Sequence, residues 1–186
     1  YMLEKMRLFL LFFNASGLGK EDLQHFPTRP FDNAMGRKFI DAAKFGDTDY
    51  LKELMIAHGK FLIYQYDHFN FTALHWAARR NHAKTVDFLL QHHGYANATD
   101  IWGRNPLYYA IENGNLSIVY ALLENNSSPW STKGCDYIEV AKGNNEVVYY
   151  IKKFRMCDLI SKFLRREERH AFRQNYIQKF IKKPAV

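Results

Sequence analysis

Residues 72–78 read Thr-Ala-Leu-His-Trp-Ala-Ala, and a related run, Asn-Pro-Leu-Tyr-Tyr-Ala, follows at 105–110. The two runs lie 33 positions apart, and the correspondence extends well beyond them. The matching pairs are Asp67 and Asp100, Thr72 and Asn105, Leu74 and Leu107, Ala77 and Ala110, Val86 and Val119, Leu89 and Leu122, and Leu90 and Leu123. A fixed period of this size is typical of a protein built from stacked repeats, each of which is one supersecondary unit.

The run 72–78 closely matches the T-P-L-H-x-A signature at the start of an ankyrin repeat, and the run 105–110 has the Pro that the first run lacks. The chain therefore resembles the ankyrin-repeat family. Two partly degenerate copies flank the clear pair, one around 42–54 with two extra residues in the stretch 59–66, and one around 140–148. The resemblance covers roughly residues 34–155.

The resemblance implies an all-α fold, an ankyrin-repeat α-solenoid of about four helix-turn-helix repeats. A single unit cannot bury its apolar face, so stacking with its neighbours must supply a continuous core. The turns between paired helices fall at Asn81-His82 and Gly114-Asn115, because Asn and Gly tolerate a left-handed backbone. The predicted core positions are Ala42, Leu54, Leu74, Ala77, Val86, Leu89, Leu107, Ala110, Val119 and Leu122.

The composition of the 186 residues is that of one globular domain, since 47% of them are hydrophobic. Only two cysteines occur, Cys135 and Cys157, and neither belongs to a CxxC pair. This excludes a disulfide scaffold and a cysteine zinc site, and favours a reducing, intracellular compartment.

The segment 1–33 is predicted to form an apolar N-terminal helix followed by a linker. Its uninterrupted apolar run, 8–13, is too short to span a bilayer as a helix, which needs about twenty residues. A signal peptide is the alternative, and docking of the helix on the first repeat or on a partner is the preferred interpretation. Pro27 and Pro30 predict an extended linker at 26–30.

The net charge of +7 is concentrated in the C-terminal part of the chain. Residues 152–186 contain eleven Lys and Arg against three acids, so the rest of the chain carries a net charge of −1. Apolar residues recur there at every fourth position, at Leu159 and Phe163 and again at Phe172, Tyr176 and Phe180. This pattern predicts that 156–186 is a basic amphipathic helical extension, with a break near Glu168.

Four interpretations of this extension stay open: it caps the last repeat, it docks on an acidic protein, it binds anionic membrane or nucleic acid, or it binds calmodulin. For the last, Ile177-Gln178 followed by Lys182-Lys183 resembles an IQ motif, whose Arg-Gly element is absent here. In the docking interpretation the apolar stripe is buried and the cations face an acidic surface. The proposed attachment residues are Phe163, Arg165, Arg166, Arg169, Phe172, Tyr176, Lys179 and Phe180.

No motif for catalysis or for a cofactor is found. The fragment Gly17-Leu18-Gly19-Lys20 has too short a spacing for a phosphate loop, and no strand precedes it. His75 matches the His of the ankyrin signature, which implies hydrogen bonds to the backbone and to Thr near the turn rather than metal binding. The sequence therefore predicts a protein that is not an enzyme and has no metal, cofactor or small-molecule substrate.

The resemblance implies binding of protein partners through the loop tips and the first helix of each repeat. The positions that this assigns are His68, Phe69, Phe71, Arg79, Arg80, Ile101, Trp102, Arg104, Glu112 and Asn113. Phe69 and Trp102 are singled out, because large aromatic residues and arginines are the usual anchors of interfaces. The alternative is that both rings fold back onto a neighbouring loop or onto the N-terminal segment.

Together these features predict a non-catalytic scaffold, an accessory subunit held in a larger multiprotein assembly. A cytoskeletal or ciliary assembly and an organellar one, such as a mitochondrial complex, are both compatible with a small basic subunit. The alternative is a free cytosolic adaptor whose basic C-terminal helix binds anionic membrane or nucleic acid.

Overall fold

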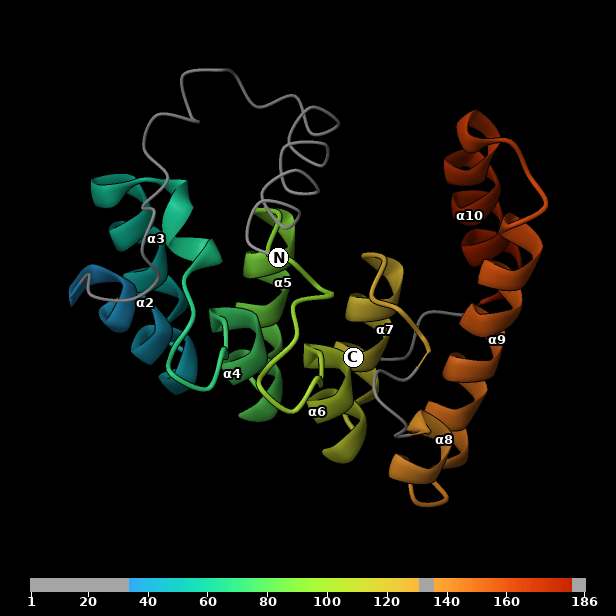
Figure 1. The fold of residues 1–186 in the computed structure, drawn as a ribbon, viewed down its shortest axis with the longest axis horizontal. Helices are drawn as coiled ribbons and strands as arrows, with labels where there is room; N and C mark the ends of the chain where they lie inside the picture. The colour runs from blue at the N-terminus through green and yellow to red at the C-terminus, as the bar shows by residue number, and fades with distance from the viewer. Residues whose placement is uncertain (1–33, 131–135, 182–186) are drawn as a thin grey trace. The chain divides into compact units, whose positions relative to one another are not determined.

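A computed structural model describes residues 34–130 and 136–181 of the chain (Figure 1). Within these ranges the regular structure is helical, apart from one isolated bridge between Tyr66 and Thr72. The helices are α2 (Ala34–Phe45), α3 (Thr48–His58), the 3-10 helix η2 (Lys60–Tyr64), α4 (Ala73–Arg79), α5 (Ala83–Gln91), α6 (Pro106–Glu112), α7 (Leu116–Glu124), α8 (Tyr137–Val140), α9 (Asn145–Ser161) and α10 (Arg166–Phe180). The predictions for the segment 1–33 lie outside the described residues.

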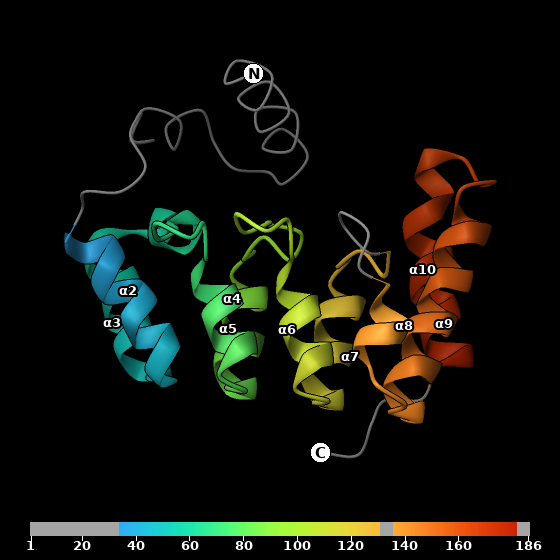
Figure 2. The ribbon, with the colours of Figure 1, turned by 60° about the horizontal axis from the view of Figure 1, so that its bottom comes forward.

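Four helix pairs form two parallel rows, which confirms the predicted all-α repeat architecture (Figures 1 and 2). The first helices, α2, α4, α6 and α8, pack in sequence along an inner row. The second helices, α3, α5, α7 and α9, pack along an outer row, and each first helix also packs on its own second helix. The stretch 59–66, where two extra residues were predicted, contains η2.

Helices α3, α4, α6, α7, α8 and α9 begin at polar residues whose side chains accept hydrogen bonds from the first turn, as N-caps do. Thr72 starts α4, and one repeat later the Asn105 side chain accepts from the backbone N–H of Tyr108 at 3.1 Å. Asn115 and Asn144 do the same for α7 and α9. Thr72 and Asn105, one period apart, therefore fix where the first helices of two successive repeats start.

The predicted core is confirmed, because none of its ten residues is more than 5% exposed. His75 is also fully buried, and its two ring nitrogens connect neighbouring repeats. Nδ1 lies 2.9 Å from Oγ1 of Thr72, and Nε2 lies 3.2 Å from the backbone oxygen of Arg104 in the next repeat. The predicted structural role of this histidine is thus confirmed.

The predicted turns between paired helices are also confirmed, since Asn81 and Gly114 have φ angles of 67° and 70°. The corresponding residue of the first repeat is Gly46, with φ of 77°. Here a side chain is also excluded by packing: a Cβ on Gly46 would lie 2.6 Å from Nδ1 of His82. The His82 ring occupies this space because its Nε2 is bonded to the backbone oxygen of Lys44 at 3.1 Å.

The C-terminal extension differs from its prediction in the position of the helix break. α9 continues through residue 155, where the sequence placed the end of the repeats, and ends at Ser161. The chain then turns at 162–165, and α10 starts at Arg166, so the break precedes Glu168. α10 packs back along α9, as the capping interpretation of the extension expects.

The predicted apolar stripe of the extension is wrong on α10, because the buried residues lie one position after the predicted ones. Ile177 and Ile181 are buried at 2% and 4% exposed, whereas Phe180 is half exposed and Phe163, in the turn, is 90% exposed. The residue one helical turn before Ile177 is Arg173, whose side chain is 12% exposed. Because Arg173 is not apolar, the apolar pattern of the sequence favours the neighbouring stripe Phe172, Tyr176 and Phe180.

Candidate protein-binding surface

Two loops between repeats, 67–72 and 100–105, have the same backbone structure and are called finger 1 and finger 2 below. In finger 1 the N–H of Asp67 donates to the oxygen of Phe71 at 2.9 Å, and in finger 2 the N–H of Asp100 donates to the oxygen of Arg104 at 2.9 Å. A residue with positive φ closes each turn, Asn70 in the first and Gly103 in the second. Figure 2 shows both loops on the same side of the helix rows.

One aspartate holds each finger together from inside. Oδ1 of Asp67 accepts from the N–H groups of Phe69 and Phe71, at 2.8 and 3.0 Å. Oδ1 of Asp100 accepts from the N–H groups of Trp102 and Arg104, at 2.8 and 2.9 Å. Both carboxylates are therefore committed to loop backbone, and each finger is a closed turn.

The second oxygen of each aspartate binds a ring donor nine residues further along, on the first helix of the repeat. The indole N–H of Trp76 donates to Oδ2 of Asp67 at 2.8 Å, and the hydroxyl of Tyr109 donates to Oδ2 of Asp100 at 2.5 Å. Burial raises the pKa of the Tyr109 hydroxyl well above its usual value, and the bond to Asp100 raises it further. Tyr109 is thus a permanent donor at neutral pH.

The two singled-out aromatic residues stack on each other across the fingers. The ring centroids of Phe69 and Trp102 are 5.7 Å apart and their planes are inclined by 23°. The backbone N–H of Ile101 joins the fingers by donating to the oxygen of Phe69 at 3.1 Å, and the His68 ring lies 3.8 Å from that of Phe69. Phe69 and Trp102 nevertheless stay 37% and 48% exposed, so contact with the neighbouring loop does not hide them.

The assignment of Phe71 to the binding surface is wrong. Phe71 is 1% exposed, and its ring packs between His75, Trp76, Trp102 and Tyr109 at centroid distances of 5.1 to 6.1 Å. It alternates with Phe69 along the finger, so one ring faces outward and the next faces the core. Phe71 is the base on which the exposed rings rest.

The predicted arginines lie over aromatic rings. Cζ of Arg79 is 5.6 to 5.7 Å from the centroids of Phe71, Trp76 and Tyr109. Cζ of Arg104 is 4.5 Å from Tyr108 and 5.9 Å from Trp102. These arginines, together with the finger residues, form one connected surface across two repeats.

The remaining predicted positions lie at the ends of the inner helices. Arg80 and Glu112 are exposed there. Nδ2 of Asn113 donates to the backbone oxygens of Ala78 and Arg79, at 3.2 and 2.9 Å. Asn113 therefore supplies hydrogen bonds to the last backbone carbonyls of α4 from the next repeat, so its amide holds the two repeats together.

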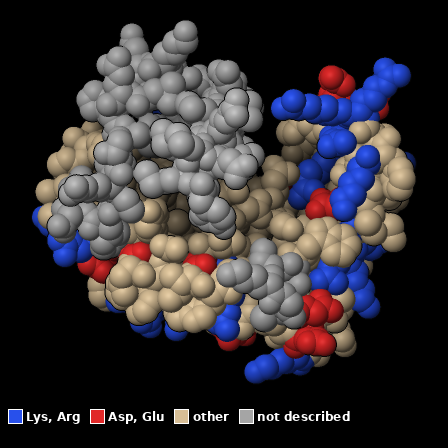
Figure 3. All heavy atoms as spheres, viewed as in Figure 1, with Lys and Arg blue, Asp and Glu red and all other residues tan. Residues whose placement is uncertain are grey.

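The proposed attachment residues do not form a single face of the extension. Arg165, Arg166, Arg169 and Lys179 are exposed, and Figure 3 shows many Lys and Arg side chains over α9 and α10. Phe172 and Tyr176 are half-buried, with ring centroids 5.8 Å apart, and Phe180 follows at 5.1 Å from Tyr176. The described chain leaves this aromatic ladder only partly covered.

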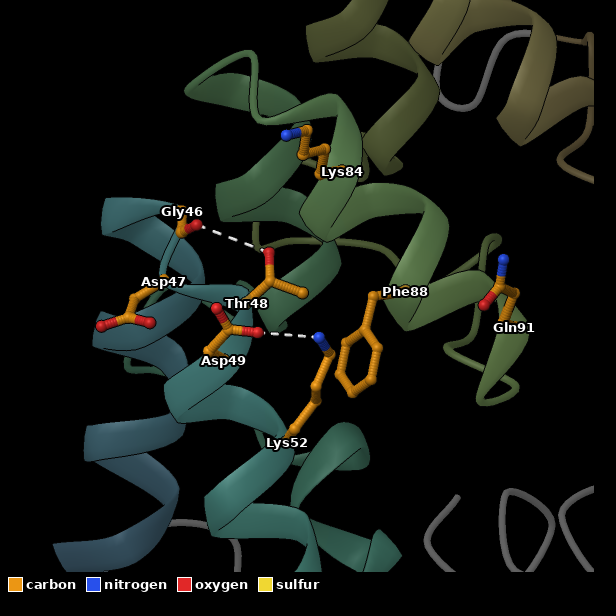
Figure 4. A pocket seen from close by; sticks show the side chains of 8 residues that line it. All are labelled: Gly46, Asp47, Thr48, Asp49, Lys52, Lys84, Phe88 and Gln91. Atoms are coloured by element: carbon orange, nitrogen blue, oxygen red, sulfur yellow. Dashed lines mark hydrogen bonds and ion pairs between the residues drawn. The ribbon is translucent and has the colours of Figure 1, made fainter.

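A groove of about 550 Å³ lies on the outer row, between α3 and α5 (Figure 4). It is lined by Gly46, Asp47, Thr48, Asp49, Lys52, Lys84, Phe88 and Gln91. Lys52 and Asp49 pair with each other at 2.8 Å, and Thr48 is bonded to Thr85 at 2.9 Å. Its polar groups thus largely satisfy each other, so we assign it no ligand.

Across 34–130 and 136–181, no three His, Cys, Asp or Glu side chains are arranged to hold a metal ion. No helix in those ranges is long and apolar enough to cross a membrane. Cys157 is a buried free thiol, and burial raises its pKa. The absence of catalysis, cofactors and small-molecule substrates stays a prediction.

Four residues that border or support the surface were not predicted from the sequence: Lys44, Trp76, and the buried Tyr108 and Tyr109. The signal for two of them was present, because Trp76 and Tyr109 are 33 positions apart and each follows a finger aspartate by nine. The contact of Lys44, whose Nζ lies 4.8 Å from the centroid of Trp76, depends on the packing of α2 against α4. No sequence spacing reveals it.

Comparison with known proteins gives one family and two partial relatives. The palmitoyltransferase AKR1 of Lachancea kluyveri is 41% identical over 54 residues, which cover 29% of this chain and 7% of that protein. The putative palmitoyltransferase ZDHHC13 of Danio rerio is 34% identical over 105 residues, covering 53% of this chain and 15% of that protein. The chain thus matches only a small fraction of each relative. The family model described as "Ankyrin repeats (3 copies)" matches residues 39–133, about half of the chain. The chain therefore belongs to the ankyrin-repeat family.

Proposed function

We propose that this chain binds a protein partner through its fingers and inner helices. The observation that carries the proposal is the exposed stack of Phe69 on Trp102, held in place by the two finger aspartates. A preordered aromatic anchor loses little side-chain entropy on binding, which is why such residues dominate interface energies. The partner would contact both fingers together, because their rings and backbones are joined.

Cross-linking from the fingers tests this proposal. A photoreactive p-benzoylphenylalanine replaces Trp102, and the full chain is irradiated in extract of the cells that produce it. The control places the same residue at Ile56, which is 86% exposed on the outer helix α3. A protein cross-linked from position 102 and not from position 56 supports the proposal; equal capture from both positions, or capture from neither, contradicts it.

The chain is further proposed to be non-catalytic. A cysteine nucleophile requires an accessible thiol with a lowered pKa, and Cys157 has the opposite properties. The two relatives raise a second candidate, in which these repeats hold a protein substrate for a palmitoyltransferase. Incubation of the chain with palmitoyl-coenzyme A and the partner identified by cross-linking tests the non-catalytic proposal, because S-acylation of the partner by this chain alone would refute it.

The C-terminal extension is proposed to attach the chain to an acidic surface within a larger intracellular assembly, with cytoskeletal, ciliary and mitochondrial assemblies all compatible. Its exposed cations and partly covered aromatic ladder support this. The alternative is that the chain is a free cytosolic adaptor whose C-terminal extension binds anionic membrane or nucleic acid. The size of the native complex, compared between the wild type and an Arg165→Gln/Arg166→Gln/Arg169→Gln variant, tests it. An unchanged size would exclude attachment through these arginines.

A further inference from the structure

A row of cations and aromatic rings crosses the inner helices beside the fingers. It is defined here as Lys44, Trp76, Arg79, Tyr109, Tyr108 and Arg104, and is called the cation-aromatic row. Nζ of Lys44 lies 4.8 Å from the Trp76 ring, and Cζ of Arg79 lies within 5.7 Å of both Trp76 and Tyr109. The Tyr109 ring is 5.2 Å from that of Tyr108, which Arg104 covers. The contacts are therefore continuous from α2 through α4 to α6.

The cations of this row form no direct ion pair with a carboxylate, although Asp100 lies close enough to Arg104 to interact with its charge. In the described parts of the chain no ion pair includes Lys44, Arg79 or Arg104. The nearest acids of the fingers, Asp67 and Asp100, accept hydrogen bonds from loop N–H groups and from ring donors. Lys44, Arg79 and Arg104 therefore have no direct ionic partner among the described residues, and a carboxylate of a partner could pair with them.

The rings fix where the cations lie. Arg79 rests on three ring systems that also contact each other around Phe71. A guanidinium whose face lies on aromatic rings keeps the N–H groups of its edge for hydrogen bonds, and it matches the two oxygens of a carboxylate. Preordering by the rings lowers the entropy that a long side chain loses when it binds.

We propose that the cation-aromatic row recognises an acidic polypeptide segment, with carboxylates of successive residues bound at Arg79 and Arg104 and a further one near Lys44. The inference rests on the proposed function, because it names the class of partner that the same surface takes. The row offers only three cations, whereas a phosphate backbone usually requires more cationic contacts, so we choose the peptide over nucleic acid. Asp41 and Glu112, exposed on the same inner helices, would repel either ligand and do not distinguish the two.

The test uses the full chain and a short fluorescein-labelled peptide of Glu, Asp and Gly, with binding followed by fluorescence anisotropy. The row variant is Arg79→Gln/Arg104→Gln. The control variant is Lys52→Gln/Lys84→Gln, which removes the same charge from the outer helices. Loss of two charge-assisted contacts should weaken binding of the peptide about tenfold or more, while the control should change it by less than about twofold. Urea unfolding of both variants establishes that each is folded.

Three results would overturn the inference: no binding of the peptide, equal weakening by both variants, or tighter binding of single-stranded DNA that depends on the same two arginines. The outcome is separable from that of the proposed function. If a partner is cross-linked from position 102 but its binding is insensitive to the row variant, the interaction function stands and the acidic partner does not. If the peptide binds the row but nothing is cross-linked from position 102, the finger anchor is refuted.

Discussion

The Trp76 indole N–H donates to Oδ2 of Asp67 at 2.8 Å, so an inner helix holds the base of the finger that precedes it. Tyr109 repeats this bond to Asp100 one period later, with a hydroxyl in place of the indole. The exposed rings at the finger tips thus rest on a hydrogen-bonded base that belongs to the helical scaffold. Binding residues and fold-determining residues alternate along the same loops.

Removal of the Tyr109 hydroxyl should destabilise the protein. Asp100 is buried, so Tyr109→Phe leaves its Oδ2 without the ring donor, and a lost hydrogen bond to a charged group costs about 1.5–3 kcal/mol. Urea unfolding measures the change. Tyr149→Phe is the control, because Tyr149 is exposed on α9 and should show a change within about 0.5 kcal/mol. Equal stability of the two variants would show that the bond contributes nothing.

Gly46→Ala should destabilise the protein more than Gly143→Ala does. Both glycines have positive φ, 77° and 84°, so both variants incur the cost of a left-handed alanine, about 1 kcal/mol. At Gly46 the new Cβ also meets the His82 ring, whereas at Gly143 nothing lies within 4 Å. Thermal or urea unfolding of the pair isolates the steric contribution. Equal losses would mean that the His82 ring moves aside freely.

Arg173 should hold α10 against the repeats. Its Nη1 pairs with Asp158 of α9 at 2.6 Å, and its Nη2 donates to the backbone oxygen of Leu123 at the end of α7, also at 2.6 Å. Arg173→Met breaks a largely buried pair and should cost about 2 kcal/mol or more. Hydrogen exchange should then show faster exchange in α10 and little change in α4–α7. Arg166→Met, at an exposed position, serves as the control, and unchanged protection of α10 would contradict the assignment.

The sequence predicted the repeats well because the period is carried by residues that every repeat needs. Helix caps, core aliphatic residues and left-handed turn positions recur at 33 residues and depend only on neighbours within one or two units. The same alignment treats positions 68, 69 and 71 alike as variable, and this is why it could not separate buried Phe71 from exposed Phe69.

Contacts without a repeat period were not predictable. Arg173 lies on the face of α10 that packs against the repeats, where it binds the Asp158 carboxylate and the end of α7. An apolar pattern cannot include this cation. Likewise, Lys44 joins the binding surface only through the packing of α2 on α4. Both residues show that the ends of the repeat array are the places where sequence patterns say least.

Trp102→Ala should weaken partner binding and leave the fold intact. Trp102 is half exposed and stacks on Phe69, so its removal should change stability by less than about 1 kcal/mol. Truncation of a central anchor commonly costs about 2 kcal/mol of binding, or roughly thirtyfold in affinity. Isothermal titration calorimetry measures the affinity of wild type and variant for the free partner that cross-linking has identified. Unfolding of the variant with unchanged association would instead identify Trp102 as a scaffold residue.

His75 should make stability depend on pH between about 4 and 6.5. Burial lowers the pKa of its imidazole from 6.5 to about 4, and Nδ1 accepts the N–H of Thr72 at 3.2 Å, so a proton there would replace an acceptor with a donor. As the pH falls below 6.5, His75 becomes protonated in the unfolded chain but stays neutral in the folded chain. The stability from this group is therefore complete above pH 6.5 and is lost towards pH 4, by about 3 kcal/mol. His75→Gln cannot titrate, so the difference in unfolding free energy between wild type and variant should shrink over this window. A difference that is the same at pH 7 and pH 4 would show that His75 is protonated in the folded protein.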